Sequence, residues 1–542
     1  YSTPDCTGLP ILSSTTIGSR ATISMPSTAS SGGAPGVVAI TNVMVRDINV
    51  TGGASFTATG TDLGNNSGWS SISAGSPPKT LYWIGGNGEW TDVNHWTTHS
   101  DGTPSIDACI PTSSDDVVFN QYSGTTAFTV TNTGALNSNC RNMTWINVPA
   151  GTIFTGNDVF IGGSLVTATG MLWKPNNTNF TATTTGQIIT LNGVSLDAPI
   201  LNPNTGNVNF SGTGGWTFMD DFKTFGRVLL SNGNLNTNGK KVNVATFNYP
   251  SSGNPIATTA TLNISNSIIE AGRWSFRNTN ITTANSHIYI TSDRFDSTNG
   301  VTYNNVTAGS TGNSVTFYGN VSFNEVVLNS NTQMEGNNTF KKLTLTPKLL
   351  TLNLASGTTQ TIEEDLFING TPCVSSTVKS VSGVANINVI AGRTEFDFVN
   401  VAGINASGLP LTFDRNSVDN GGNSNITFKT GTGGLVGLGA DLTCNEIDAA
   451  NPSTYTLDAK GFYGGISTIY EWRKIVGTGS SATTIIGTGS VLDISTTGYG
   501  TYRVTVNYGG TPNCTVSDDI IISAKTAVPT AAATQKICNN SQ

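Results

Sequence analysis

Short runs of alternating apolar and polar residues recur between residues 186 and 354. Asn, Gly, Ser and Thr separate the runs, and each run is too brief for a helix. Such segments bury little surface alone, so they must stack, strand on strand, at a spacing of about 4.8 Å. The pattern predicts a parallel β-helix, a solenoid whose neighbouring coils share one elongated core. The runs are 188–191, 242–244, 262–264, 288–290, 315–317, 326–328, 343–345 and 352–354.

Two distant stretches, 43–68 and 399–425, match in residue type and spacing. Ile48 and Ile404 are 356 residues apart, and Asp62 and Asp419 are 357 apart. A cysteine and a Ser/Thr-rich segment precede each stretch, with 12–14 corresponding to 374–376. We interpret the match as an internal repeat of about 350 residues. Chance similarity in a sequence of low complexity is the alternative.

Residues 441–522 have a different pattern, with strand-like segments every 10 to 20 residues. This spacing is typical of an antiparallel sandwich, and a Cys…Trp…Cys order with Gly-x-Tyr-x-Val-x-Val at 500–506 favours the immunoglobulin type. The predicted fold class is all-β, a parallel β-helix or solenoid repeat followed by an Ig-like β-sandwich. The expected domains are 1–76, the end of a preceding β-helix repeat unit with a linker; 77–436, an aromatic-capped β-helix unit; 437–525, the sandwich; and 526–542, a linker and the start of a following domain.

Composition narrows the function. Only 11% of the residues are charged, against about 25% in ordinary soluble domains, and the net charge is -8. The 25 Lys and Arg residues form no stripe, which argues against nucleic-acid binding. The sequence contains no apolar run of about 20 residues, so no membrane span is expected. Without a recognisable signal peptide or sorting domain, the chain is expected to be a window of a longer protein.

Three tryptophans, Trp83, Trp90 and Trp96, lie within fourteen residues. Large aromatic side chains over the first coil would cap the open end of a solenoid. The alternative is a carbohydrate-binding platform, because tryptophan faces stack on sugar rings.

Two further sets of residues are candidates for ligation or cross-linking. Asp62 with Asn65, and Asp419 with Asn423, offer oxygen ligands for Ca²⁺, or form Asx turns instead. No other cofactor is expected. Two cysteine pairs fall within single predicted domains and suit disulfides in an oxidising compartment, with buried unpaired thiols as the alternative. The pairs are Cys109 with Cys140, and Cys444 with Cys514.

An enzyme is not expected. Polysaccharide-degrading β-helices need carboxylates grouped on one face, whereas adjacent strand residues face opposite ways. The available pairs are adjacent ones, Asp115-Asp116, Asp220-Asp221, Glu363-Glu364 and Asp518-Asp519, and no nucleophile or phosphate-binding motif accompanies them.

Three groups of residues resemble very large secreted surface proteins of Bacteroidota, especially the gliding-motility mobile adhesins. They are 82–90 with His95-Trp96, the ending 62–69, and the sandwich 454–517 with its Asn-Cys-Thr-Val. The second copy departs from the pattern, with Ile426 where the first has Trp69. The resemblance implies export by the type IX secretion system, display at the outer membrane, and movement along the cell surface.

The predicted function is therefore a structural and adhesive segment, a stalk and spacer, of a large extracellular surface adhesin. Its expected partners are surface glycans or abiotic surfaces, with the secretion and gliding machinery engaged through regions outside this chain. The first alternative is a carbohydrate-binding surface module that uses Trp83, Trp90 and Trp96. The second is a β-helix polysaccharide-degrading enzyme.

Overall fold

The computed structural model describes residues 11–429 and 456–522, apart from gaps inside both ranges. The regular secondary structure of the described residues is β-strand except for one 3-10 turn, η1 (Val93–His95), which confirms the all-β class. The chain divides into two compact units, Tyr1–Phe340 and Lys341–Gln542. The longest internal gaps are 28–35, 198–205, 249–259, 460–468, 476–483 and 508–514.

Residues 11–74 of the first unit form parallel strands with a small core. Val43, Val45 and Phe56 are buried in it and alternate with more exposed positions, as expected for strands with one buried face. One sheet has the order β1 (Ile11–Ser13), β3 (Val37–Arg46), β5 (Ser55–Asp62), β6 (Ser71–Ala74), and β2 (Ala21–Ser24) pairs with β4 (Ile48–Thr51).

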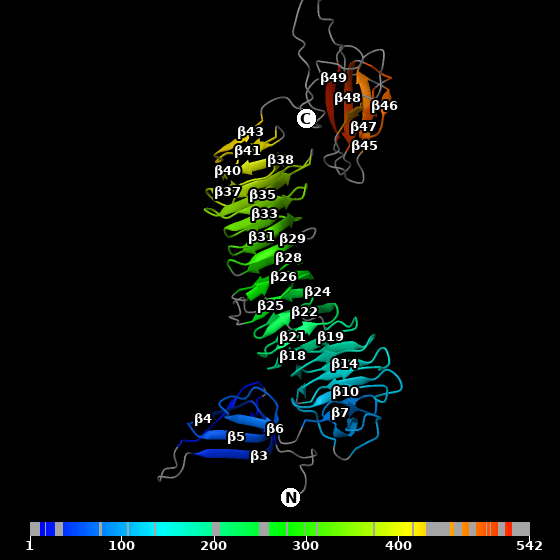
Figure 1. The fold of residues 1–542 in the computed structure, drawn as a ribbon, viewed down its shortest axis with the longest axis vertical. Helices are drawn as coiled ribbons and strands as arrows, with labels where there is room; N and C mark the ends of the chain where they lie inside the picture. Colours follow the sequence, from blue (N-terminus) through cyan, green and yellow to red (C-terminus); the bar gives the residue numbers. More distant parts are fainter. Residues whose placement is uncertain are drawn as a thin grey trace, which may run out of the picture. The chain divides into compact units, whose positions relative to one another are not determined.

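Between residues 80 and 180 the strands lie in successive layers (Figure 1). From residue 116 to residue 180, successive strands join three parallel sheets in a fixed order. The chain therefore returns to the first sheet after every third strand, so that β10 pairs with β13, β11 with β14 and β12 with β15. The first sheet holds β7 (Thr80–Trp83), β10 (Asp116–Phe119), β13 (Met143–Trp145) and β16 (Leu165–Val166), with β9 (Trp96–Thr97) antiparallel to β7; the second holds β8 (Gly88–Glu89), β11 (Thr129–Asn132), β14 (Ile153–Gly156) and β17 (Leu172–Pro175); the third begins with β12 (Ser138–Cys140), β15 (Val159–Ile161) and β18 (Asn177–Phe180).

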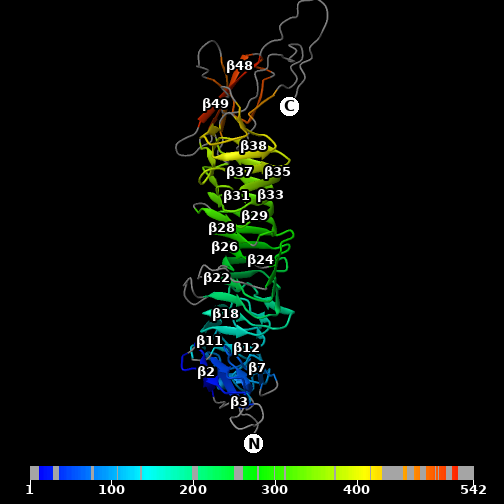
Figure 2. The same cartoon turned by 90° about the vertical axis from the view of Figure 1, so that its left-hand side faces the viewer.

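From residue 187 to residue 297 the strands alternate between two sheets, and Figure 2 shows them stacked in successive layers. The strands of the second of these sheets are longer, and a register shift between Thr224 and Arg227 marks a bulge in one of them. The first sheet continues with β19 (Gln187–Thr190), β21 (Gly215–Phe218), β23 (Asn234–Asn236), β25 (Thr261–Asn263) and β27 (Asn280–Thr282); the other with β20 (Asn207–Phe210), β22 (Phe222–Leu230), β24 (Lys241–Phe247), β26 (Ile268–Phe276) and β28 (His287–Ser297), followed by β29 (Thr302–Ala308), β30 (Val315–Tyr318), β31 (Ser322–Leu328) and β32 (Thr332–Met334).

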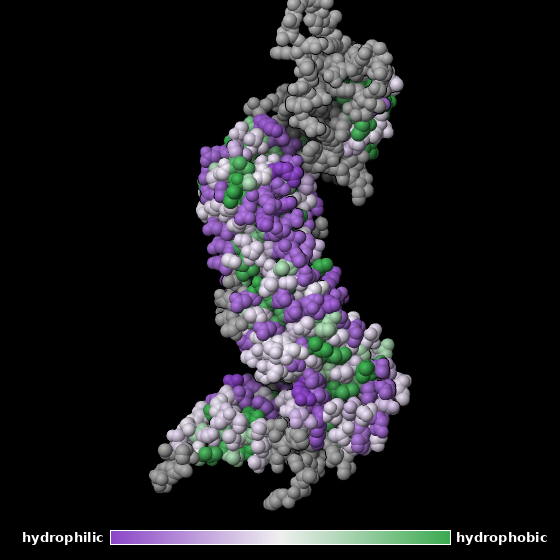
Figure 3. Space-filling view, viewed as in Figure 1, coloured by the Kyte–Doolittle hydropathy of each residue, from purple (hydrophilic) through white to green (hydrophobic). Residues whose placement is uncertain are grey.

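The interior of these layers is apolar and rich in aromatic residues. Alternate strand residues point inward, as Val117 and Phe119 do in β10, where both are fully buried. Aromatic rings continue from one layer to the next: Phe119 stacks on Trp145 with ring centroids 3.5 Å apart. The face seen in Figure 3 is mostly hydrophilic or near neutral, with smaller apolar patches.

The second unit begins with parallel strands and ends with antiparallel ones. β33 (Asn338–Leu345) carries the chain into it. The parallel strands are β34 (Thr351–Leu354), β35 (Thr359–Asn369), β36 (Ser376–Ser380), β37 (Ala385–Val389), β38 (Thr394–Asp397), β39 (Val399–Ala402), β40 (Ile404–Gly408), β41 (Leu411–Phe413), β42 (Val418–Asp419) and β43 (Ile426–Phe428).

The antiparallel strands enclose a separate core. Trp472, Tyr502 and Val504 are fully buried there and pack with Leu457 and Ile520. One sheet has the order β46 (Ile485–Gly487), β45 (Ile469–Ile475), β48 (Gly500–Asn507), β49 (Thr515–Ile522), and β44 (Thr456–Asp458) pairs with β47 (Val491–Asp493).

Candidate functional site

The three clustered tryptophans lie inside the protein. Trp83, Trp90 and Trp96 are 0%, 0% and 2% exposed. Trp96 lies edge-on to both of the others, with ring centroids 5.1 Å from Trp83 and 4.9 Å from Trp90. A sugar platform needs an exposed indole face, so the prediction that these side chains bind carbohydrate is wrong. The three side chains stabilise the core instead, because aromatic rings in contact contribute more stability than their buried area alone accounts for.

A short polar segment holds this cluster in place. The side chain of Asp92 accepts a hydrogen bond from the backbone N–H of Asn94 at 3.0 Å and so begins the turn η1. His95 at the end of the turn stacks on Trp83, with ring centroids 4.6 Å apart, and its Nδ1 lies 2.7 Å from the carbonyl oxygen of Ile84. The imidazole is therefore a packing and hydrogen-bonding group of this cluster.

Glu89 fastens the same region to the next layer. Its carboxylate accepts hydrogen bonds from the hydroxyl of Thr131 at 2.6 Å and from the backbone N–H groups of Thr133 and Gly134 at 2.6 and 3.1 Å. Burial alone would raise the pKa of Glu89, but these hydrogen bonds outweigh it and hold the pKa below its ordinary value. The ionised carboxylate is thus a structural clamp.

The proposed calcium loops are Asx turns. Asp62 Oδ1 accepts hydrogen bonds from the backbone N–H of Gly64 at 2.8 Å and from Asn66 Nδ2 at 2.7 Å. Asn65, the other predicted ligand, has a left-handed backbone, and its Nδ2 donates to Asp47 Oδ1 at 2.6 Å. Amide N–H groups therefore point at the oxygens that a cation would need, so the Ca²⁺ prediction is wrong for Asp62 and Asn65.

The second loop has the same bonds. Asp419 Oδ1 accepts hydrogen bonds from the N–H of Gly421 at 2.8 Å and from Asn423 Nδ2 at 2.6 Å. The Ca²⁺ prediction for Asp419 and Asn423 fails for the same reason. Within the part of the chain that the structure describes, no three His, Cys, Asp or Glu side chains come together in a way that could hold a metal ion.

The cysteine prediction is wrong where it can be assessed. Cys140 is a free, fully buried thiol, so no disulfide joins it to Cys109, which is also buried. The Sγ atom of Cys140 lies 3.9 Å from the carbonyl oxygen of Phe160. Cys444 and Cys514 lie outside the described residues, and their pairing stays a prediction.

Cys140 is expected to resist alkylation in the native protein. Burial, together with the nearby carboxylates Asp116 and Asp115, raises the pKa of its thiol well above the ordinary value. Iodoacetamide at about pH 8 should leave Cys140 unmodified until guanidinium unfolds the chain, and peptide mass spectrometry with and without denaturant measures this. Rapid native modification, or a shift in peptide mass on reduction alone, would contradict the buried-thiol assignment.

The paired carboxylates serve structural hydrogen bonds. The carboxylate of buried Asp115 accepts from the backbone N–H of Lys79 at 2.8 Å, whereas its neighbour Asp116 forms an ion pair with Arg141 at 2.6 Å. Burial would raise the pKa of Asp116, but the hydrogen bonds from Arg141 and Asn142 hold it below its ordinary value. These two carboxylates have separate partners, as expected for adjacent strand residues.

Two other pairs differ in detail. Asp220 accepts from the backbone N–H of Leu191 at 2.8 Å, and Asp221 from that of Lys241 at 3.0 Å. Glu363 and Glu364 are both exposed, because the burial pattern of β35 changes phase between them. The alternation rule therefore fails at this strand.

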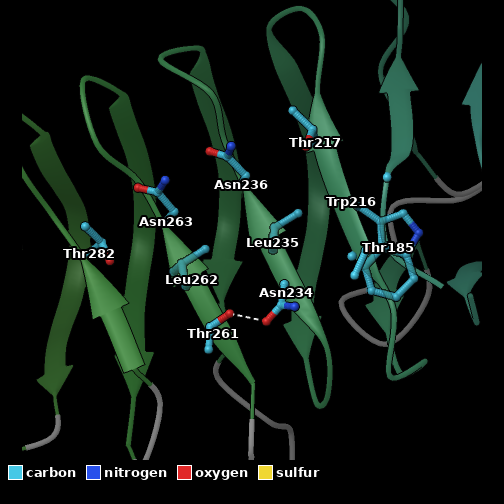
Figure 4. Close-up of a pocket in the computed structure, with 12 residues that line it drawn as sticks. Thr185, Trp216, Thr217, Asn234, Leu235, Asn236, Thr261, Leu262, Asn263 and Thr282 are labelled. Atoms are coloured by element: carbon cyan, nitrogen blue, oxygen red, sulfur yellow. Dashed lines mark hydrogen bonds between the residues drawn. The ribbon is translucent and has the colours of Figure 1, made fainter. Parts of the chain in front are cut away.

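A shallow groove that the sequence reasoning missed lies along one outer sheet face in the first unit. It has a volume of about 290 Å³ and crosses β21, β23, β25 and β27 (Figure 4). Side chains from four successive strands lie in one row across it, in the register Thr217, Asn236, Asn263, Thr282. The clue in the sequence was the recurrence of polar–apolar–polar triplets at 234–236, 261–263 and 280–282.

A second hollow, of about 510 Å³, lies beside the tryptophan cluster. It is lined by residues 85–87 and 121–128, and Tyr122 beside it is 51% exposed. The Oδ1 atom of Asn87 accepts a hydrogen bond from the backbone N–H of Thr129 at 2.7 Å, which fixes that side chain at the rim.

Comparison with protein-family models, with curated proteins and with solved structures finds no match to this chain. Among the residues that the structure describes, no helix is long and apolar enough to cross a membrane.

Proposed function

We propose that this chain is a structural and adhesive segment of a large secreted cell-surface adhesin, in which a parallel β-helix acts as a stalk and an Ig-like sandwich acts as a spacer. The observation that carries the proposal is the repeated loop. The same hydrogen bonds recur around Asp62 and Asp419, 357 residues apart in the sequence. A protein that duplicates a whole stack of strands extends its reach, and no reactive group is needed for that role.

The strand rotation supports the β-helix. A β-helix is a chain that visits the same few parallel sheets in order and gains one layer with each circuit, as the strands do with three sheets between residues 116 and 180 and with two sheets between residues 187 and 297. Side chains stack in the core from layer to layer, and Phe323 on Phe340 is one such stacked pair, with ring centroids 5.3 Å apart. Successive layers thus depend on each other for a shared interior.

Two contacts support the Ig-like sandwich. Trp472 is fully buried in β45, and its Nε1 donates to the carbonyl oxygen of Gly489 at 2.8 Å. The hydroxyl of Tyr502 in β48 donates back to the carbonyl oxygen of Gly498 and to the hydroxyl of Thr497. A tyrosine that binds backbone a few residues upstream is the tyrosine corner of immunoglobulin-type domains.

Extracellular display follows from the same proposal. The resemblance of 82–90 and 454–517 to Bacteroidota surface adhesins supports export by the type IX secretion system and a place at the outer membrane. The sparsely charged, Asn- and Thr-rich composition suits contact with glycans or abiotic surfaces. Gliding motility would add movement of the displayed chain along the cell.

Attachment under flow tests the proposal. Beads that carry the full chain, coupled through one terminus, are expected to stay on glass and on polysaccharide-coated glass at flow rates that remove albumin-coated beads. The same chain, heat-denatured before coupling, should lose this attachment because the stacked surface is gone. Release of native and albumin beads at equal flow would overturn the adhesive function.

A further inference from the structure

The groove face presents two parallel rows of small polar side chains. The first row, Thr217 to Thr282, was described above, and Ile188, 38% exposed, precedes Thr217 in the same register. The second row is Asn234, Thr261 and Asn280, one residue from each of β23, β25 and β27. The two rows alternate with inward residues such as Leu235, so they lie about 7 Å apart, and members of one row are about 4.8 Å apart.

The asparagines of the first row are held with their amide nitrogens free. The Oδ1 atom of Asn236 accepts the backbone N–H of Asn238 at 2.9 Å, and that of Asn263 accepts the N–H of Ser265 at 3.0 Å. Each oxygen is thus tied into its own Asx turn. The Nδ2 groups of both residues donate to no group among the described residues, so two oriented donors stand one strand apart.

The second row adds hydroxyl and amide groups in a fixed arrangement. The hydroxyl of Thr261 donates to Oδ1 of Asn234, as the dashed line in Figure 4 marks. This bond orients Asn234 and leaves its Nδ2 group available at the groove. Gly215 occupies the next position of this row, and because it has no side chain, nothing projects from the sheet face beside Asn234.

The groove face carries no charge, whereas the other sheet at the same level is charged. No residue that lines the groove is Asp, Glu, Lys or Arg. By contrast, Lys241 of β24 pairs with Glu270 of β26 at 2.7 Å, and Arg273 pairs with Asp293 at 2.5 Å. The separation of charged from uncharged faces disfavours an anionic ligand at the groove, because nothing there would offset its charge.

We propose that this face binds an extended, neutral polysaccharide chain that runs across the strands. The inference rests on the proposed adhesive function and names its ligand class. Hydroxyl groups of successive sugars would accept from the Nδ2 donors of Asn236 and Asn263 and exchange hydrogen bonds with Thr217 and Thr282. A polymer suits a row that repeats its groups at every strand, and Ile188 offers an apolar contact for a sugar ring.

Affinity electrophoresis in native gels tests the inference with named probes. Dextran, xylan and mixed-linkage β-glucan are the neutral polysaccharides, and alginate is the acidic one. The full chain should be retarded by at least one neutral polysaccharide and not by alginate. The double variant Asn236→Asp/Asn263→Asp keeps both turn acceptors but loses both donors, so its dissociation constant should rise about tenfold or more.

Two further variants separate the possible causes. Asn353→Asp/Asn388→Asp places the same two charges on partly exposed strand positions of the second unit and should bind as the unaltered chain does. Thr217→Val/Thr282→Val removes two groove hydroxyls without adding charge and should also weaken binding. Retardation by alginate only, or equal binding by the Asn236→Asp/Asn263→Asp variant, would overturn the inference.

The bead experiment keeps the two proposals distinguishable. If the beads hold to glass but no neutral polysaccharide retards the chain, the groove assignment is wrong and the adhesive function stands. If the beads detach like albumin beads but dextran, xylan or β-glucan retards the chain, the adhesive function is wrong and the groove assignment stands.

Discussion

Replacing Trp90 with alanine is expected to lower the stability of the first layers by about 4 kcal/mol. The indole is 0% exposed and lies against Trp96, Phe119 and Phe154, with ring centroids 4.9, 6.3 and 5.8 Å away. The substitution removes this ring and leaves a cavity between layers that cannot collapse, because neighbouring strands fix their spacing. Hydrogen exchange of the β11 and β14 amides, read in the full chain, measures the local loss.

Two comparison variants make the result specific. Trp90→Phe should cost much less than alanine, because Nε1 of Trp90 is buried without a hydrogen-bond partner among the described residues. Tyr122→Ala, at a half-exposed aromatic nearby, should change stability by less than about 0.5 kcal/mol. A Trp90→Ala chain with unchanged exchange rates and weakened glycan binding would restore the sugar-platform interpretation.

The strand pattern could be predicted from sequence because it depends on local alternation. Runs such as 262–264 and 315–317 fall within or beside observed strands, and their apolar members are buried. The turns also follow from composition. Of the ten described non-glycine residues with positive φ, eight are asparagine, which tolerates the left-handed backbone that a tight turn between stacked strands needs.

The residues that face each other on neighbouring strands could not be predicted, because these pairings depend on the register between segments that are distant in the sequence. From the sequence, residues 12–14 were matched to 374–376. In the structure Leu12 pairs with Val45. The repeat equivalent of Val45 is Val401, and Val401 pairs with Val378. The true counterpart of Leu12 is thus Val378, four residues beyond the predicted match at Val374. The groove was missed for the same reason: each polar triplet is unremarkable alone and acquires meaning only when the ladder aligns it with the next.

The tryptophan and cysteine predictions show a second limit. The sequence favoured a capping role for Trp83 but left a sugar platform as the alternative until its burial was known, since the residue type suits both. Cys109 and Cys140 share a predicted domain, but sequence separation says nothing about whether two Cβ atoms approach within disulfide distance. Functions that need a particular geometry, such as sugar binding or a disulfide, therefore could not be decided from the sequence, whereas the strand pattern could.

Removing Asn66 or Asn423 is expected to weaken the two copies alike, by about 2 to 3 kcal/mol of local stability each. Asn66 Oδ1 accepts the backbone N–H of Ile48 at 3.0 Å, and its Nδ2 donates to the carbonyl oxygen of Val45 at 2.9 Å. Asn423 makes the same bonds to Ile404 and Val401, at 2.9 and 3.0 Å. Alanine at either position leaves a backbone donor and acceptor without their partner.

The amide protons of Ile48 and Ile404 report this loss directly. Each should exchange faster in the Asn66→Ala or Asn423→Ala chain respectively, while the amide of the other copy keeps its rate. Asn353→Ala, at a partly exposed strand position, is the matched control and should leave both rates unchanged. If only one of the two amides responds to its own substitution, the loops are not structural equivalents. The duplication on which the stalk proposal depends would then lose its support, because the shared hydrogen bonds are what distinguish a true repeat from similar composition.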